Sequence, residues 1–377
     1  MDFNFSDEQV QLADAVARWA DKAYTFDRRV ATSKAGGFSD DAYQEMAALG
    51  LCGLVTDSDF DGIDMGPVEA MVVMEKLGAA LVVEPIALTW MASATLQQFA
   101  SSALKTQWLP ALASGEKRLA IALNERGGRY RVSVCTTQAT SAQGAGAEAG
   151  SATLTGSKHV VLGGGSAHAF IVNAQLNGQP ALFIVARDAA GVQCEAYGTQ
   201  DGGNAAELHL DNAPAQLLTT SGAEASALIE AMGIAFLAAE AVGVMEKTLA
   251  MTVDYMNTRQ QFRSAIASFQ ALRHKVADVK MALELARSMS YYATLKLNAP
   301  AAERRQAISR AKVQLGESMR FVGQTCVQLH GGIGVTDEYA VSHYFKRLTQ
   351  MEMTYGDTLH HLGVVSDAMD ETAGVFA

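Results

Sequence analysis

The middle of the chain differs from both of its ends in residue composition and in the spacing of its apolar residues. Residues 119–215 are rich in Gly, Thr and Ser and contain short β-prone runs such as RLAIALNE, TLTGSKHVVLG and PALFIVAR, separated by turn residues. The residues on either side instead repeat apolar side chains at helical spacing. This order predicts an α+β fold in which an antiparallel barrel or sandwich lies between two helical regions.

The first region, residues 1–118, is expected to form an N-terminal helical domain. Ser6 and Gln9 have the spacing of a capping box, and the apolar residues after them recur at helical intervals. Pro85 breaks the later helical patterns, which end near Pro110. Further helices are predicted over residues 40–50, 68–82 and 88–113.

The third region, residues 222–377, is helical again. Apolar residues recur there along one face of each predicted helix, and Pro300 breaks the chain between two of them. Four long helices predict an antiparallel four-helix bundle as the C-terminal domain. The predicted helices cover residues 226–258, 268–297, 302–329 and 357–373.

Composition excludes several classes of function. Only 18% of the 377 residues are charged and 49% are apolar, as in ordinary globular proteins. The net charge of −11 argues against nucleic acid or an anionic membrane as a partner, and no apolar run approaches the length of a membrane span. The four cysteines are dispersed, without a metal-ligand or disulfide pattern. We therefore expect no metal and a cytoplasmic protein, and the acidic N-terminal stretch does not predict a signal peptide.

A first candidate binding stretch covers residues 254–293. Arg259 and Arg263 lie near the turn between two predicted helices, and Gln270 begins the second helix. Arginine presents a planar fork to phosphate, and a helix N-terminus adds backbone donors. The alternative is a pair of surface arginines beside a capping glutamine.

A second candidate stretch covers residues 328–348. Gly331 and Gly332 fall within a helical pattern, where two glycines cost about 2 kcal/mol relative to alanine. Such a cost indicates that the backbone approaches something closely. The neighbour is either a ligand or another helix.

Together these two stretches resemble the acyl-CoA dehydrogenase family of flavoproteins, and the helical, β, helical order is similar to that family over essentially the whole chain. The wording of residues 240–262, 268–293 and 303–348 is similar to that of the small subunits of pimeloyl-CoA dehydrogenase-type heteromeric enzymes. The resemblance implies FAD at a subunit interface, where one subunit encloses the flavin and its neighbour donates side chains and backbone. The matching cofactor-binding positions are Arg259, Phe262, Gln270, Gln328, Gly331, Gly332 and Thr358.

The β region departs from the family pattern. Where the family reads Lys-x-Trp-Ile-Thr-Asn against the flavin, this chain reads KHVVLG at residues 158–163, so Val160 replaces the tryptophan and Leu162 the threonine. Where the family's preceding loop reads Thr-Glu-Pro-Gly-Ala-Gly-Ser-Asp, residues 124–130 read NERGGRY, with two arginines and no serine. These differences fall in the half of the flavin site that the family builds from its own chain.

The family's general base matches a glycine here. The common pattern Tyr-Glu-Gly-Thr places a glutamate beside the substrate α-carbon, and the gapless match at residues 355–358 has Gly356 at that position. Some members carry the base at a position that falls near Gly233 and Ile234, which offer no carboxylate. Asp357 is then a candidate base, although a shift of one residue turns a helical side chain by about 100°. The alternative for Asp357 is a helix cap, and Glu352 is a weaker second candidate for the base.

The resemblance implies the α,β-dehydrogenation of an acyl-CoA thioester to the 2,3-enoyl-CoA, with an electron-transfer flavoprotein as acceptor. The leading hypothesis is a small, β-type subunit that donates half of an FAD site to a homologous large acyl-CoA dehydrogenase subunit in a heterotetramer. A self-sufficient homo-oligomer that uses Asp357 as base, a non-catalytic structural subunit, and an oxidase or flavin monooxygenase remain as alternatives.

Overall fold

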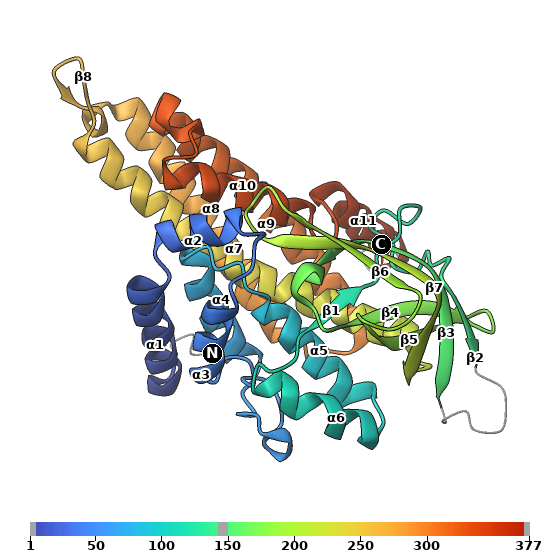
Figure 1. The fold of residues 1–377 in the computed structure, drawn as a ribbon. Helices are drawn as coiled ribbons and strands as arrows, with labels where there is room; N and C mark the ends of the chain where they lie inside the picture. The colour runs from blue at the N-terminus through green and yellow to red at the C-terminus, as the bar shows by residue number, and fades with distance from the viewer. Residues whose placement is uncertain (1–4, 142–149, 373–377) are drawn as a thin grey trace. The chain divides into compact units, whose positions relative to one another are not determined.

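The chain forms two compact units. The structure is a computed structural model that describes residues 5–141 and 150–372, and Figure 1 shows its course. One unit combines Met1–Val30, Pro67–Val82 and Ile234–Ala377, and the other combines Ala31–Gly66 and Val83–Gly233. Two helices, α2 (Phe26–Lys34) and α7 (Gly222–Thr258), contribute residues to both units.

A seven-stranded sheet forms the core of the unit that contains Val83–Gly233. The strand order is β1-β4-β2-β3-β7-β5, with β6 paired to β7, and β4 also pairs with β5. The path β4-β2-β3-β7-β5 therefore closes on itself as a barrel, which leaves few free edges. The strands are β1 (Leu119–Ala122), β2 (Gln138–Ser141), β3 (Ser151–Leu162), β4 (Ala169–Leu176), β5 (Gln179–Ala186), β6 (Val192–Gly198) and β7 (Asn204–Thr219).

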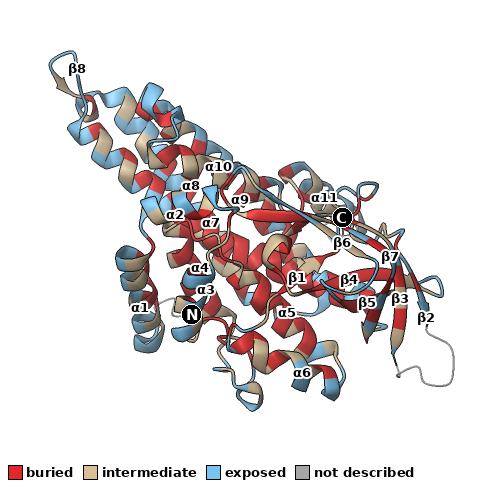
Figure 2. Ribbon diagram, in the orientation of Figure 1, coloured by how far each residue is buried: buried red, intermediate tan, exposed pale blue. Residues whose placement is uncertain are grey.

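The barrel is mainly but not wholly antiparallel. The pairs of β4 with β1 and with β2 are parallel, which the sequence did not predict. Apolar side chains fill its interior, including Leu154, Phe170, Phe183 and Leu208, none of which is exposed to solvent. Figure 2 shows this burial along the strands.

The same unit carries several helices. Ser39 caps one of them through the Ala42 amide, and Trp90 Nε1 donates to Leu51 O at 2.6 Å. These contacts hold the helices of the unit to their connecting loops. The helices are α3 (Asp40–Ala48), η1 (Ser58–Phe60), α5 (Ile86–Phe99), α6 (Ser102–Ala113) and the short η2 (Gly164–Ser166).

The other unit is built almost entirely from helices. A Cβ on Gly243 would lie 1.9 Å from Glu75 O, and one on Gly78 would lie 2.2 Å from Glu240 O, so glycines allow two of its helices to cross at backbone contact. Arg347 pairs with the buried Glu240 at 2.6 Å. The elements are α1 (Asp7–Ala23), α4 (Pro67–Ala79), β8 (Gln260–Gln261), β9 (Ser264–Ala265), η3 (Ile266–Ser268), α8 (Gln270–Leu295), α9 (Ala301–His330), η4 (Gly331–Val335), α10 (Ala340–Met353) and α11 (Thr358–Thr372).

Helix α7 corrects one sequence prediction. By length and composition it is apolar enough to cross a membrane, although no apolar run of that length was expected from the sequence. However, 94% of its most apolar stretch is buried within the protein. Core helices of globular proteins have the same length and composition, so α7 is explained as a core helix.

The predicted α+β fold, with N-terminal helices, a central β-rich region and a C-terminal helical region, is confirmed. The capping box at Ser6 and Gln9 is also present. Helices α2 and α10 were missed. The signal for α10 was available, since Val341, Tyr344, Leu348 and Met351 lie at helical spacing and are buried.

Candidate functional site

A short hairpin carries two of the predicted cofactor-binding residues, Arg259 and Phe262. Strands β8 and β9 pair through Gln260 with Ala265 and Gln261 with Ser264, and Figure 1 shows them at the tip of the helices of their unit. Phe262 and Arg263 form the turn, with φ of 51° and 67°. The left-handed conformation costs about 1–2 kcal/mol for each residue that is not glycine. Phe262 is nevertheless 87% exposed, so burial within this chain does not offset that cost.

The other donated positions also lie on the surface. Gln270 begins α8 and Gln328 lies in the last turn of α9, both exposed. Gly331 caps α9 with φ of 67°, and both Gly331 and Gly332 have open space where a Cβ would be. Close packing against another helix of the described chain therefore does not explain the glycine pair. An exposed backbone of this kind suits contact with an external ligand.

The β3 segment that matches the family's flavin-contacting residues has an irregular backbone. The pairing register with β7 shifts between Lys158 and Val161, and Val160 has φ of 50° while being half exposed. A β-branched residue with positive φ is a clear outlier. Val160 and Leu162 offer this surface neither an aromatic ring nor a hydroxyl.

A polar cluster that the sequence did not predict lies beside Val160. Glu207 on β7 accepts hydrogen bonds from the Val160 amide at 3.3 Å and from the Tyr197 hydroxyl at 3.1 Å, and it also contacts His159. Burial alone would raise the pKa of Glu207, but these hydrogen bonds lower it. Because its members come from β3, β6 and β7, no local sequence signal could have identified the cluster.

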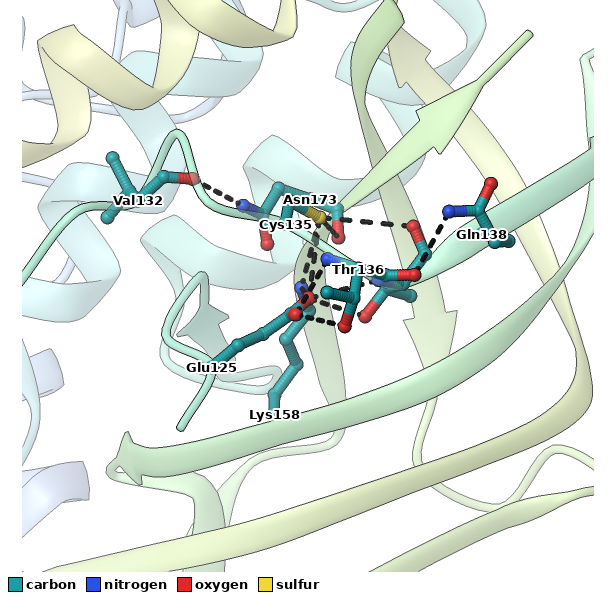
Figure 3. A network of polar contacts seen from close by, with 8 residues as sticks. Glu125, Val132, Cys135, Thr136, Gln138, Lys158 and Asn173 are labelled. Atoms are coloured by element: carbon teal, nitrogen blue, oxygen red, sulfur yellow. Dashed lines mark hydrogen bonds and ion pairs between the residues drawn. The ribbon is translucent and has the colours of Figure 1, made fainter. Parts of the chain in front are cut away.

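The loop of residues 124–130 contributes a buried ion pair. Lys158 Nζ lies 2.6 Å from Glu125 Oε1, and the lysine side chain has no exposed surface. The backbone and hydroxyl groups of Thr136 and Thr137 donate four further hydrogen bonds to the same carboxylate. Burial alone would raise the pKa of Glu125, but these donors hold it well below its usual range. Figure 3 shows these contacts, with Cys135 beside the pair.

Gly356, which the resemblance aligns with the family's base, is enclosed by two histidines. Its φ is 103°, and a Cβ there would lie 2.6 Å from His360 Cδ2 and 2.7 Å from His361 Nε2. His361 is buried, and burial lowers its pKa to about 4. Both the backbone and the surroundings therefore oppose any side chain at this position.

Asp357 acts as a helix cap in this structure. Its Oδ1 accepts a hydrogen bond of 2.8 Å from the backbone N–H of His360, three residues later, at the start of α11. This is the usual geometry of an N-cap aspartate. The alternative role of Asp357, as a shifted base, is not needed to explain its position.

Glu352 is engaged inside the protein. It accepts hydrogen bonds from the Thr358 amide at 3.2 Å, from the Thr358 hydroxyl at 2.8 Å and from Arg320 at 3.0 Å. Thr358, which the resemblance assigned to the cofactor, therefore donates its hydroxyl hydrogen bond to Glu352. Glu352 is 8% exposed, so the weaker candidate base is also enclosed.

A buried lysine holds the backbone around these residues. Lys312 Nζ donates to the carbonyl oxygens of Met351, Glu352 and Gly356 at 3.0, 2.8 and 2.9 Å. Burial lowers the pKa of Lys312 to about 8, against the opposing effect of Glu352 and Asp357. The other family position for a base offers nothing further, because Gly233 and Ile234 are both buried within α7.

The two ends of the chain match family models described as the N-terminal and C-terminal domains of acyl-CoA dehydrogenase, over residues 6–116 and 231–369. The chain is 26% identical to the acyl-CoA dehydrogenase FadE27 of Mycobacterium tuberculosis, with 89% of each protein covered. It is 27% identical to the short-chain-specific acyl-CoA dehydrogenase of Megasphaera elsdenii, with 93% of this chain and 95% of that protein covered.

Among solved structures, the chain is similar to the ChsE4-ChsE5 complex from Mycobacterium tuberculosis. The TM-score is 0.88 at 26% sequence identity, with 99% of this chain and 100% of that chain covered. The similarity therefore covers the whole length of both chains.

Proposed function

Since the chain belongs to the acyl-CoA dehydrogenase family, whose members are FAD-dependent oxidoreductases, we propose that it is the small subunit of a heteromeric acyl-CoA dehydrogenase. It donates half of an FAD site to a homologous large subunit. That subunit supplies the base and most of the flavin-binding surface.

The observation that carries this proposal is the enclosure of Gly356. A side chain at Gly356 would meet the rings of His360 and His361 and a backbone of positive φ. The nearby carboxylates, Asp357 and Glu352, are engaged as a helix cap and within a hydrogen-bond cluster. A general base must reach the proton that it removes. A chain built in this way depends on a carboxylate from another subunit.

The exposed donated residues support the same proposal. Phe262, Gln270, Gln328 and the glycine pair lie on the surface with polar groups and backbone open to a ligand. Arg259 would neutralise the pyrophosphate of FAD, and Gly331 and Gly332 would admit the cofactor against the backbone. When bound, FAD accepts the hydride that leaves the β-carbon of the acyl group.

The β3 segment that would face this chain's own flavin also supports the proposal, because it lacks the side chains that the family uses there. Val160 offers no aromatic ring and Leu162 offers no hydroxyl at the positions where the resemblance implies contact with the flavin. The similar ChsE4-ChsE5 structure is a complex of two named components. We extend the proposal to an electron-transfer flavoprotein as the acceptor of the assembled enzyme.

Flavin content tests the proposal. The full chain is purified alone and after co-expression with a homologous large acyl-CoA dehydrogenase subunit, and oxidised-flavin absorbance and its bleaching by acyl-CoA thioesters are recorded. We expect a colourless chain alone and FAD in the co-expressed pair, with Phe262→Ala reducing FAD retention. Phe321→Ala, which changes an exposed phenylalanine of α9, is the matched control. A chain that alone carries FAD and bleaches with acyl-CoA contradicts the proposal.

A further inference from the structure

The β8–β9 turn places an arginine where the backbone favours glycine. A two-residue turn with positive φ at both central positions is commonly Asn-Gly or Gly-Gly, because these residues adopt that conformation at low cost. Here the central residues are Phe262 and Arg263. The resemblance assigned a role to Phe262 and none to Arg263.

Contacts within the chain do not account for Arg263. Arg263 is exposed, and across residues 5–141 and 150–372 its side chain makes no hydrogen bond or ion pair. The hairpin is held by other groups: Ile266 N–H donates to Arg259 O at 2.9 Å, and the Phe262 and Phe269 rings meet edge to face at 6.1 Å. A glycine at position 263 would therefore leave every one of these contacts in place and would relieve the backbone.

The charge of the hairpin is unbalanced. Residues 259–270 contain Arg259 and Arg263 and no aspartate or glutamate. Two guanidinium groups on one short exposed hairpin match the two negative charges of a pyrophosphate, and arginine binds phosphate oxygens through paired hydrogen bonds. Phe262 beside them offers an exposed aromatic surface.

From the strained turn, the unpaired side chain and the unbalanced charge, we infer that Arg263 is a second cationic ligand of the FAD pyrophosphate held by the partner subunit, beside Arg259. This inference rests on the proposed function. It explains why a costly conformation is retained at a position where no contact in the described part of the chain requires an arginine.

Arg263→Gly separates a binding role from a structural one. The assembled heteromer is stripped of FAD and titrated with FAD by flavin fluorescence, and thermal unfolding is measured in parallel. We expect FAD affinity to fall about tenfold, as for the loss of one charge-assisted hydrogen bond, while the melting temperature stays equal or rises. Arg263→Asn, which tolerates the same backbone conformation, is expected to lose the same affinity, and Arg263→Lys is expected to lose less. Arg310→Gln, at an exposed arginine of α9, is the control, because it removes a surface charge with little change in helix propensity.

Two results would overturn the inference. One is an Arg263→Gly heteromer with the FAD affinity of the wild type. The other is a variant heteromer whose subunits, without FAD, associate about tenfold more weakly than those of the wild type. That result would place Arg263 against partner protein rather than cofactor. A wild-type pair that takes up no FAD would instead refute the proposed function. If the wild-type chain alone binds FAD, the same titration is run on that homo-oligomer.

Discussion

A Cβ atom on Gly356 would lie 2.7 Å from Nε2 of His361, and that nitrogen donates a hydrogen bond of 2.8 Å to Tyr355 O. The histidine therefore holds the backbone of Tyr355, the residue before the glycine, and its ring lies where a side chain on Gly356 would begin. His361 is 2% exposed, so it cannot swing into solvent without opening the start of α11. At the position that the resemblance aligns with the family's base, histidine rings of the following helix therefore lie where a side chain would begin.

Restoring glutamate at this position should not create an autonomous enzyme. We expect Gly356→Glu to lower the free energy of unfolding by about 2–4 kcal/mol, because the new side chain meets both histidines and the backbone has positive φ. The variant chain, purified alone, should show no flavin bleaching with acyl-CoA. Urea unfolding and the bleaching assay measure the two effects.

Gly363→Glu is the matched control, because Gly363 lies in α11 with open space around it. Glutamate is a better helix former than glycine, so this variant should be as stable as the wild type or more stable. If Gly356→Glu were equally stable and bleached its flavin with acyl-CoA, the enclosure of the base position would not be what limits this chain.

Two substitutions of Asp357 distinguish a helix cap from a catalytic base. Asparagine caps helices as well as aspartate does, so Asp357→Asn should keep both stability and the turnover of the assembled heteromer. Asp357→Ala should lose about 1 kcal/mol of stability, since the His360 amide loses its acceptor. Loss of acyl-CoA-dependent bleaching in the Asp357→Asn heteromer would identify Asp357 as the base instead.

Burial of His361 predicts acid sensitivity. The unperturbed pKa is 6.5, and burial lowers it to about 4 in the folded protein, with Lys312 and His360 acting in the same direction. Between these two pH values the unfolded state binds more protons than the folded state. Stability is therefore fully present above pH 6.5 and falls as the pH is lowered towards 4, by about 3 kcal/mol over the whole window.

The measurement is urea unfolding of wild type and His361→Gln at several pH values across that window. The difference between the two proteins removes the contribution of carboxylates common to both. We expect His361→Gln to be less stable than the wild type at neutral pH and to lose less stability on acidification. Parallel pH profiles for the two proteins would show that His361 is not the group responsible.

The Glu125–Lys158 pair should be sensitive to the loss of one partner. Lys158→Met leaves a carboxylate at a buried position without its counter-charge, so we expect a loss of about 3–5 kcal/mol. Glu125→Gln combined with Lys158→Met removes both charges and should cost less than Lys158→Met alone. A double-mutant cycle from urea unfolding measures the coupling, and strictly additive losses would show that the pair does not act as a unit.

Local sequence patterns explain which predictions of the fold succeeded. The capping box at Ser6, the break at Pro300 and the β-prone runs of the central region depend on residues close together in the chain. Helix α10 carried such a signal too, in the spacing of its buried apolar residues. The parallel pairing of β4 had no such signal, because it joins strands distant in sequence.

The residues of the candidate site likewise include some that local motifs suggested and others that only the structure showed. From local motifs the resemblance assigned Arg259, Phe262 and the glycine pair to the cofactor, which stays a prediction, and matching one short pattern showed the glycine at position 356. Neither the left-handed turn at Arg263 nor the Glu207 cluster could be predicted from the sequence. Residue spacing does not determine these backbone angles or the contacts between strands.

By itself, then, the sequence determined the order of helices and strands, the family, and the absence of a glutamate at position 356. Only the tertiary structure decided what that absence means. Lys312 reaches from α9 to three carbonyls around Gly356, and the ring of His361, in the first turns of α11, lies in the space where a side chain would begin. Patterns of residue type record local preferences, whereas the room for a side chain depends on how the backbone turns and which rings it brings over that position.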